Sequence, residues 1–254
     1  MAAEKAGERI DVGGHALGVI VSGNGSRCFL CLHGLVDRIA IWDRLEPHLA
    51  RLGRVVRIDQ RGHGASDAPP GPYSLGDLAR DAVAVLDRLG IASAVFVGHS
   101  MGGVVSMTAA IEHPERVSGL VLLGTASQSS ARVVEWYETI ARAGEENGID
   151  GLRRAIYGER SNREIRGDAA GIARVTRALA TLHERPLTPR LAAVTCPALA
   201  LVGERDPMGP KASAIVASVL PRATLEVFAG RGHWLHVEAP EDVARAIEGM
   251  LHLF

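Results

Sequence analysis

The stretch Gly98-His99-Ser100-Met101-Gly102-Gly103 decides the fold of this chain. It is a G-x-S-x-G sequence between an apolar run, residues 94–97, and a helical pattern that starts near Met101. A serine at a sharp strand-to-helix turn has a strained and crowded backbone, which small neighbours accommodate. The N–H groups at the start of the helix favour a developing negative charge nearby. We therefore predict that Ser100 is a nucleophile held above the end of a strand.

Further short apolar runs lie on both sides of this stretch, and helical patterns separate them. Near-continuous apolar runs are typical of strands that are covered on both faces. The predicted strands are residues 28–32, 55–58, 94–97, 120–123, 198–202 and 224–228, preceded by a hairpin of residues 8–12 and 16–21 around Gly13-Gly14. The clearest helices are residues 75–89, which follow a capping box of Ser74 and Asp77, then 101–111 and 243–251. This alternation predicts a doubly wound α/β fold with a mostly parallel sheet, whose ligands bind beyond the carboxyl ends of the strands.

One segment interrupts the alternation. Residues 126–190 contain no convincing strand but show helical patterns at 133–141, 152–157 and 170–182. We interpret them as a helical insertion into a core domain formed by residues 1–125 and 191–254. The aromatic side chains Trp136, Tyr137 and Tyr157 either pack this insertion onto the core or, together with Trp234, line a substrate site.

Composition narrows the classes of partner. The 254 residues are 47% hydrophobic, which suffices for one catalytic domain with a sizeable core. The 28 basic and 29 acidic residues give a net charge of −1 without long runs of one sign, so we expect neither nucleic acid nor a membrane as partner. No signal-like or membrane-spanning run is present, and we expect a cytoplasmic protein. Cys28, Cys31 and Cys196 are expected to be buried, with no disulfide or metal site.

A serine hydroxyl needs a base within hydrogen-bonding reach. His233 follows the last predicted strand on a glycine-rich loop, so it arrives at the same edge of the sheet as Ser100. His236 is the alternative base, since it lies only three residues further on. His99 is expected to pack beside Ser100 rather than to deprotonate it.

The base in turn needs an orienting acid. Asp206 lies just past the strand at 198–202 and directly before Pro207. Glu204 is the alternative on the same loop. The order Ser100, Asp206, His233 is that of nucleophile-elbow enzymes.

An oxyanion site needs two N–H donors. We assign one to the backbone of Met101, the residue after the nucleophile. The other should come from the loop after the strand at 28–32, where Leu35 is the best candidate. His33 in that loop is expected to hydrogen-bond to the loop itself. This chemistry requires no cofactor and no metal.

These motifs together resemble those of the α/β-hydrolase superfamily, in particular its small serine esterases and lactonases. The stretch 59–66 is similar to the family's D-x-R-G-x-G-x-S loop, and 232–241 is similar to its terminal histidine segment. The resemblance favours His233 over His236, implies a structural role for the loop at 59–66, and implies that residues 126–190 form the cap that selects the substrate.

Within the superfamily, the resemblance favours hydrolysis of a small, largely apolar ester or lactone. Ser100 stands where haloalkane dehalogenases and epoxide hydrolases have aspartate. The stretch 67–74 is similar to 3-oxoadipate enol-lactonases. His233-Trp234 is similar to hydrolases that cleave a carbon–carbon bond in ring-fission products, although those have asparagine in place of His99. A cofactor-free perhydrolase or lyase and a non-catalytic ligand receptor are the remaining alternatives.

Overall fold

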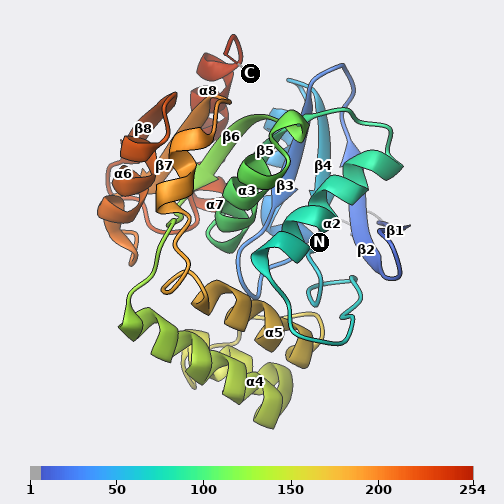
Figure 1. The fold of residues 1–254 in the computed structure, drawn as a ribbon, viewed down its shortest axis with the longest axis vertical. Coiled ribbons are helices and arrows are strands. Elements are labelled where there is room, and N and C mark those ends of the chain that lie inside the picture. The colour runs from blue at the N-terminus through green and yellow to red at the C-terminus, as the bar shows by residue number, and fades with distance from the viewer. Residues whose placement is uncertain (1–6, 254) are drawn as a thin grey trace.

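The computed structural model describes residues 7–253, and its described residues form one central eight-stranded sheet (Figure 1). The strand order is β1-β2-β4-β3-β5-β6-β7-β8. The hairpin strands β1 and β2 are antiparallel to their neighbours, and β3 to β8 pair in parallel. The strands are β1 (Glu8–Asp11), β2 (Ala16–Ser22), β3 (Cys28–Leu32), β4 (Arg54–Ile58), β5 (Ala94–His99), β6 (Val117–Leu123), β7 (Ala198–Gly203) and β8 (Ala223–Phe228).

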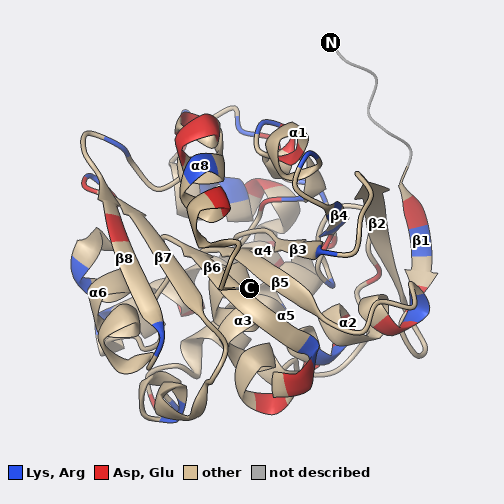
Figure 2. Cartoon of the chain, turned by 90° about the horizontal axis from the view of Figure 1, so that it is seen from above, with Lys and Arg blue, Asp and Glu red and all other residues tan. Residues whose placement is uncertain are grey.

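Helices cover both faces of the sheet. Figure 2 shows α1 and α8 on one side and α2, α3 and α6 on the other. Because side chains alternate along a strand, the strands β3 to β7 each contribute to both of the resulting cores. The helices are α1 (Glu46–Leu49), α2 (Leu75–Arg88), α3 (Met101–Glu112), α4 (Ala131–Tyr157), α5 (Ala169–Ala180), α6 (Gly209–Val219), α7 (Leu235–Glu238) and α8 (Pro240–Met250), with short 3₁₀ helices η1 (Ile39–Trp42), η2 (Pro114–Arg116) and η3 (Thr188–Ala193).

The predicted α/β architecture is confirmed. Every predicted strand is present, and the capping box at the start of α2 forms as expected, with the Ser74 side chain and the Asp77 backbone bonded to each other. Helix α6 lies outside the predicted helices, because its small and weakly amphipathic residues give little helical periodicity. No helix within residues 7–253 combines the length and apolar character needed to cross a membrane.

The segment between β6 and β7 is helical, and α4 and α5 pack against each other apart from the sheet (Figure 1). The two predicted helices at 133–141 and 152–157 belong to α4, which is broken at Gly148 by a φ of 62°. The insertion has a small hydrophobic core formed by Ile140, Leu152, Ile165 and Ile172. Val36, from the loop after β3, is part of the same core. The insertion therefore packs directly on a loop of the sheet.

Two of the three cysteines are buried as predicted. Cys28 and Cys31 are buried in β3 on opposite faces of the sheet, and Cys196 is half buried. All three are free thiols, and no disulfide joins them. Burial raises the pKa of Cys28 to about 11, so this thiol stays neutral and behaves as a small apolar side chain.

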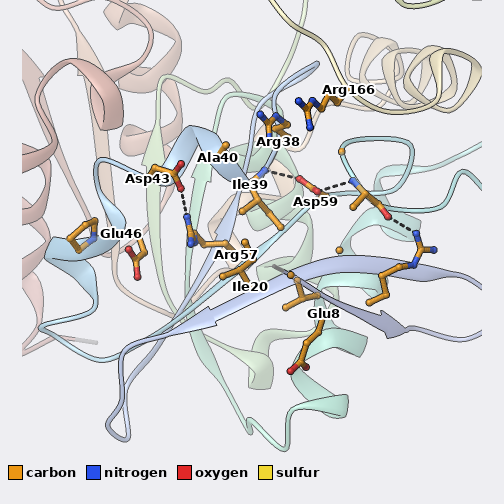
Figure 3. A pocket seen from close by; sticks show the side chains of 17 residues that line it. Glu8, Ile20, Arg38, Ile39, Ala40, Asp43, Glu46, Arg57, Asp59 and Arg166 are labelled. Carbon is orange, nitrogen blue, oxygen red and sulfur yellow. Dashed lines mark hydrogen bonds and ion pairs between the residues drawn. The ribbon is translucent and has the colours of Figure 1, made fainter. Parts of the chain in front are cut away.

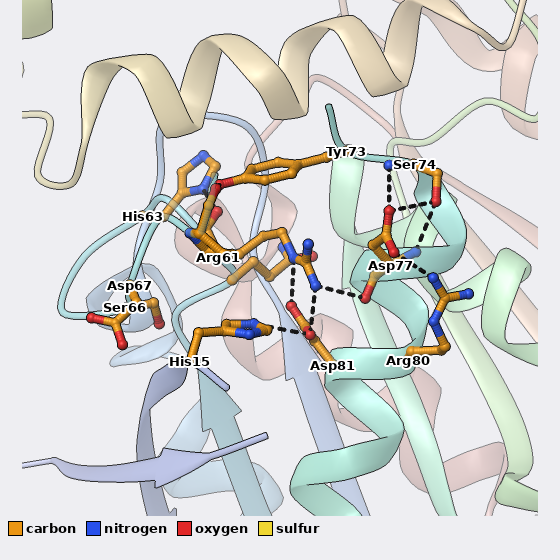
Figure 4. A network of polar contacts seen from close by, with 12 residues as sticks. His15, Arg61, His63, Ser66, Asp67, Tyr73, Ser74, Asp77, Arg80 and Asp81 are labelled. Atoms are coloured by element: carbon orange, nitrogen blue, oxygen red, sulfur yellow. Dashed lines mark hydrogen bonds and ion pairs between the residues drawn. The ribbon is translucent and has the colours of Figure 1, made fainter. Parts of the chain in front are cut away.

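The loop after β4 is anchored by a polar network (Figure 4). Arg61 donates two 2.7 Å hydrogen bonds to the carboxylate of Asp81 on α2, and its guanidinium lies over the Tyr73 ring. His15 Nε2 lies 3.1 Å from the same carboxylate. Asp59 accepts hydrogen bonds from the backbone N–H groups of Ile39 and Ala65. These side chains are occupied in holding loops together, which agrees with the structural role that the resemblance implies.

Candidate active site

The Ser100 turn has the backbone of a nucleophile elbow. Ser100 follows β5 directly, has a φ of 51°, and immediately precedes α3. Its N–H donates to the carbonyl of Leu123 on β6, and its own carbonyl accepts from Thr125 Oγ1 at 2.7 Å. The positive φ is unfavourable for a residue with a side chain, so these bonds must hold the turn in place.

Two glycines make this turn sterically feasible. A Cβ on Gly98 would lie 2.4 Å from the carbonyl oxygen of Gly102. A Cβ on Gly102 would lie 1.9 Å from the carbonyl oxygen of Leu32. Both contacts involve backbone atoms that cannot move aside, so the G-x-S-x-G pattern is a packing requirement at this point.

His233 and Asp206 form a direct pair. Nδ1 of His233 lies 2.7 Å from Oδ2 of Asp206, whose other oxygen accepts the Met208 N–H at 2.8 Å. The Asp206 side chain is fully buried. A carboxylate bonded to Nδ1–H leaves Nε2 as the free proton acceptor.

Gly124 leaves space for the Asp206–His233 pair next to the Ser100 turn. This role was not predicted from the sequence. Gly124 follows β6, whose last residue accepts the Ser100 N–H. A Cβ on Gly124 would lie 2.6 Å from Asp206 Oδ2 and 3.1 Å from His233 Nδ1. Only a glycine leaves room for the pair beside the elbow. The Ser100 hydroxyl itself has no hydrogen bond to His233 here, and such bonds often tighten only when substrate binds.

The alternative acid and base are engaged elsewhere. Glu204 is exposed and accepts the Gly230 N–H at 2.8 Å, so it ties together two loops. His236 is fully buried, with its ring centroid 4.6 Å from that of Trp42. Burial lowers the pKa of His236 to about 3, so this imidazole is neutral at pH 7. Neither side chain contacts the Asp206–His233 pair through a hydrogen bond.

His99 packs between two histidines. Its ring centroid lies 4.6 Å from that of His233 and 4.5 Å from that of His236. Its Nε2 lies 3.1 Å from the His233 carbonyl, so it donates there and supports the loop that carries His233. Burial, then the neighbouring His236 and His233, lower the pKa of His99, and the ring is neutral.

The predicted oxyanion donors are available. Among the hydrogen bonds of residues 7–253, none uses the backbone N–H of Leu35 or of Met101. The loop is fixed instead by its neighbours: Val36, at a φ of 60°, donates its N–H to His63 Nε2 at 3.2 Å. His33 bonds to the Gly34 carbonyl at 2.8 Å, which matches the expected bond within its own loop.

A cavity of about 480 Å³ opens at Ser100 beneath the insertion. Its lining is largely apolar, and it includes Tyr137 from α4. Trp136 is 45% exposed, does not line this cavity, and packs its ring against Tyr137. Trp234 makes an edge contact with His233 at 5.2 Å between ring centroids. The apolar lining residues include Val104, Val133, Leu179, Leu182, Met208 and Ile215.

The larger cavity of about 820 Å³ lies elsewhere, beside β1, β2 and the loop after β3 (Figure 3). It contains none of Ser100, Asp206 and His233. Its wall includes Arg57, which is 2% exposed and bonds to Asp43 at 2.7 Å. Within residues 7–253, no group of three or more potential ligand side chains is arranged to bind a metal ion.

Asp37 is a site residue that sequence reasoning missed. It follows the proposed oxyanion loop, and its Oδ2 lies 3.8 Å from His99 Nδ1. Burial raises its pKa to about 6, against the opposing charge of Arg163. A carboxylate in a loop carries no periodic signal, so only the folded arrangement reveals it.

Comparisons with known proteins agree with the fold. A family model described as alpha/beta hydrolase fold matches residues 28–150. The chain is 28% identical over 239 residues to 3-oxoadipate enol-lactonase 2 of Acinetobacter baylyi, covering 87% of each chain. It is 31% identical over 217 residues to 2-hydroxymuconate semialdehyde hydrolase of Pseudomonas putida, covering 78% of this chain and 76% of that one. The enol-lactonase structure from Burkholderia xenovorans superposes with a TM-score of 0.86 at 24% identity, over 96% of this chain and all of that one.

Proposed function

Because this chain belongs to the α/β-hydrolase superfamily and is a hydrolase of the enol-lactonase-like type, we propose that it cleaves a small carboxylic ester or lactone through an acyl-enzyme. Ser100 is the nucleophile, His233 the general base and Asp206 the acid that orients His233. The observation that carries this proposal is the 2.7 Å bond between His233 and Asp206, made beside a strained Ser100 turn.

The mechanism follows from these groups. Ser100 Oγ attacks the carbonyl carbon while His233 Nε2 takes the hydroxyl proton, which forms a tetrahedral oxyanion. The intermediate collapses, the bond to the leaving alkoxide breaks, and His233 returns its proton to that alkoxide. Water then attacks the acyl-enzyme, again giving its proton to His233. The carboxylic acid leaves, and Ser100 regains its proton.

The oxyanion is held by the Leu35 and Met101 N–H groups in this proposal. Both donors lack a partner within the described residues, so neither must break a bond to receive the substrate oxygen. Each donor of this kind contributes about 3 kcal/mol to stabilising the transition state. Their fixed backbone positions also spare the site any reorganisation during the reaction.

We further propose that residues 126–190 form a cap that selects the substrate. Tyr137 of α4 lines the cavity at Ser100 together with Leu179 of α5, and it packs against the hydrophobic core to which α5 contributes. Tyr157 and Trp234 flank the site on the His233 side. Trp136, which is exposed, stays a predicted contact for a substrate that extends out of the cavity.

Hydrolysis of a carbon–carbon bond is the second candidate reaction. The 31% identity to a 2-hydroxymuconate semialdehyde hydrolase favours it. The experiment that separates the two is a substrate profile over p-nitrophenyl esters of increasing acyl length, lactones and ring-fission products. Ester or lactone turnover with the highest kcat/KM supports the proposal, and a clear preference for ring-fission products contradicts it.

Asp206→Asn should lower kcat by about a thousand-fold or more. The amide keeps a hydrogen-bonding group near His233, but it stabilises neither the required tautomer nor the imidazolium. Glu204→Gln is the matched control, because Glu204 lies on the same loop and its side chain accepts the Gly230 N–H rather than a bond from His233. Steady-state kinetics on a p-nitrophenyl ester distinguish them. A crippled Glu204 variant with an active Asp206 variant would reverse the assignment.

A further inference from the structure

Val36, in the loop after β3, has a backbone conformation that a valine rarely adopts. Its φ is 60°, and the N–H of Asp37 donates to the carbonyl of Gly34 at 3.2 Å. Residues 34–37 therefore form a tight turn with Val36 at its third position, where a positive φ is normally taken by glycine or asparagine. A β-branched side chain makes this conformation more strained still. Contacts with the rest of the protein must hold the turn in this form.

The imidazole of His63 supplies one of these contacts. Its Nδ1 lies 3.1 Å from the Arg61 carbonyl oxygen, and its Nε2 lies 3.2 Å from the backbone nitrogen of Val36. A carbonyl only accepts and a backbone N–H only donates, so Nδ1 carries the proton and the lone pair of Nε2 faces Val36. The side chain is fully buried, and this burial lowers the pKa of His63 to about 3, so the ring stays neutral. Rotation of the peptide between Leu35 and Val36 would relieve the strain but would break this bond.

The insertion holds both ends of this contact. The Val36 side chain is buried in the hydrophobic core of the insertion. Residues 62–64 pair antiparallel with residues 166–168 of the insertion, through two backbone hydrogen bonds of 2.9 Å. The two segments lie so close that a Cβ on Gly167 would be 2.8 Å from the Cα of His63. The insertion therefore fixes the backbone of His63, whose ring in turn fixes Val36.

This arrangement decides which N–H of the loop is available to a substrate. Among the hydrogen bonds of residues 7–253, the N–H of Val36 goes to His63, and that of Leu35 goes to no acceptor. Leu35 and Val36 share one peptide group, so its rotation changes the backbone of Leu35 as well as the φ of Val36. A donor stabilises an oxyanion only when it already points at the position that the oxygen will take. Neither His63 nor Gly167 lines the cavity at Ser100, so neither can act by touching a substrate bound there.

We propose that His63 is a positioning residue, which couples the insertion to the Leu35 oxyanion donor by holding Val36 in its strained turn. This inference rests on the proposed serine hydrolase activity. It adds that the insertion governs the rate of the chemical step as well as the choice of substrate, through contacts that do not reach the substrate.

His63→Leu removes the acceptor and keeps a buried side chain of similar size. It should lower kcat for p-nitrophenyl butanoate by about tenfold to a hundredfold, up to the loss caused by removing one oxyanion donor, and change KM by less than about threefold. The inhibition constant of hexyl trifluoromethyl ketone should rise by the same factor as kcat falls. This ketone forms a hemiketal with Ser100, whose oxyanion occupies the same site as that of the reaction. A merely structural role of His63 would lower the folded fraction and leave this constant unchanged.

Two further variants of the same loop act as controls. Ser66→Ala also removes a buried acceptor of a backbone N–H, since Ser66 Oγ accepts from Gly18 at 2.9 Å, and it should keep kcat within about threefold of the wild-type value. His63→Gln restores an acceptor near the position of Nε2 and should recover most of the rate. An unchanged kcat and inhibition constant in His63→Leu, or an equal loss in Ser66→Ala, would overturn the proposal.

Gly167→Ala tests the contribution of the insertion and decides the matter if His63→Leu does not fold. The added Cβ pushes the insertion away from His63, so kcat should fall and the inhibition constant should rise together, by about threefold or more. Gly158→Ala is the matched control, a glycine of the insertion with a φ of 85° whose Cβ would meet no atom within 4 Å. It shares the backbone strain of the substitution and should leave both quantities within about twofold. Equal effects in the two variants would contradict the coupling.

A Val36→Gly background separates the strained turn from a general loss of stability. Glycine takes a φ of 60° without help, so His63→Leu should lower kcat by less than about threefold when residue 36 is glycine. A loss as large as that in the wild-type background would show that His63 does not act through Val36.

Failure of the proposed function is recognised separately. If the wild-type protein hydrolyses no ester or lactone, or if Ser100→Ala keeps its rate, the serine hydrolase assignment is wrong. Hydrogen exchange at the Val36 amide then decides the coupling alone. Protection that is lost in His63→Leu and in Gly167→Ala but kept in Ser66→Ala supports it, and equal protection in all three variants contradicts it.

Discussion

Ser100→Ala should lower kcat for p-nitrophenyl esters by about a million-fold, the loss typical when the nucleophile of such a triad is removed. The substitution deletes one oxygen and keeps the Cβ, so the packing of the elbow and its bonds to Leu123 and Thr125 remain. We therefore expect an unchanged circular dichroism spectrum together with nearly complete loss of turnover. Steady-state kinetics and thermal unfolding on the same preparation check both parts.

Ser106→Ala is the matched control for this change. Ser106 is a fully buried serine of α3, and its hydroxyl donates to the Gly102 carbonyl at 2.8 Å. Removing that hydroxyl should cost some stability and leave kcat within about tenfold of the wild-type value. A Ser100→Ala protein that keeps more than about 1% of the wild-type rate would contradict the assignment, because Ser100 could not then be the required nucleophile.

His233→Ala should also reduce kcat by about a million-fold, since the serine hydroxyl is a weak nucleophile without a base. The buried Asp206 carboxylate would then lose its imidazole partner, which adds a cost in stability. Kinetics at saturating ester, corrected for the folded fraction, isolates the catalytic effect.

His236→Ala is the informative comparison, because it removes the same side chain three residues away. His236 packs against Trp42 and His99 and bonds to neither Asp206 nor Ser100. Its loss leaves a cavity in the core, so we expect a lower melting temperature with most of the activity retained. If His236→Ala abolishes turnover while His233→Ala remains active, His236 is the base.

The structural features that the sequence predicts are those encoded locally. The strands at 28–32 and 198–202 are runs of apolar residues bounded by loops, and the structure has them at β3 and β7. The nucleophile elbow is equally local. Gly98 and Gly102 are required because a Cβ at either position would clash with a residue a few positions away or with the adjacent strand. The positions of Ser100, Asp206 and His233 after their strands follow from parallel topology.

What the sequence leaves out depends on side chains that meet only after folding. Gly124 matters because the Asp206–His233 pair needs the space where a Cβ would be, and those residues lie far away in sequence. Asp37 and Arg163 are unremarkable charges in loops until the insertion packs onto the loop after β3. Neither the charge pattern nor the hydrophobic periodicity of the sequence predicts which of these distant residues come into contact.

The assignment of Ser100 as the nucleophile is tested most directly by labelling with a fluorophosphonate, followed by peptide mass spectrometry. An activated serine attacks the phosphorus, fluoride leaves, and a stable phosphonyl-serine remains. We predict that the wild-type protein is labelled on one peptide, at Ser100, and that Ser100→Ala is not labelled. Labelling that persists in Ser100→Ala, or a wild-type label on another residue, would contradict the assignment of Ser100 as the nucleophile.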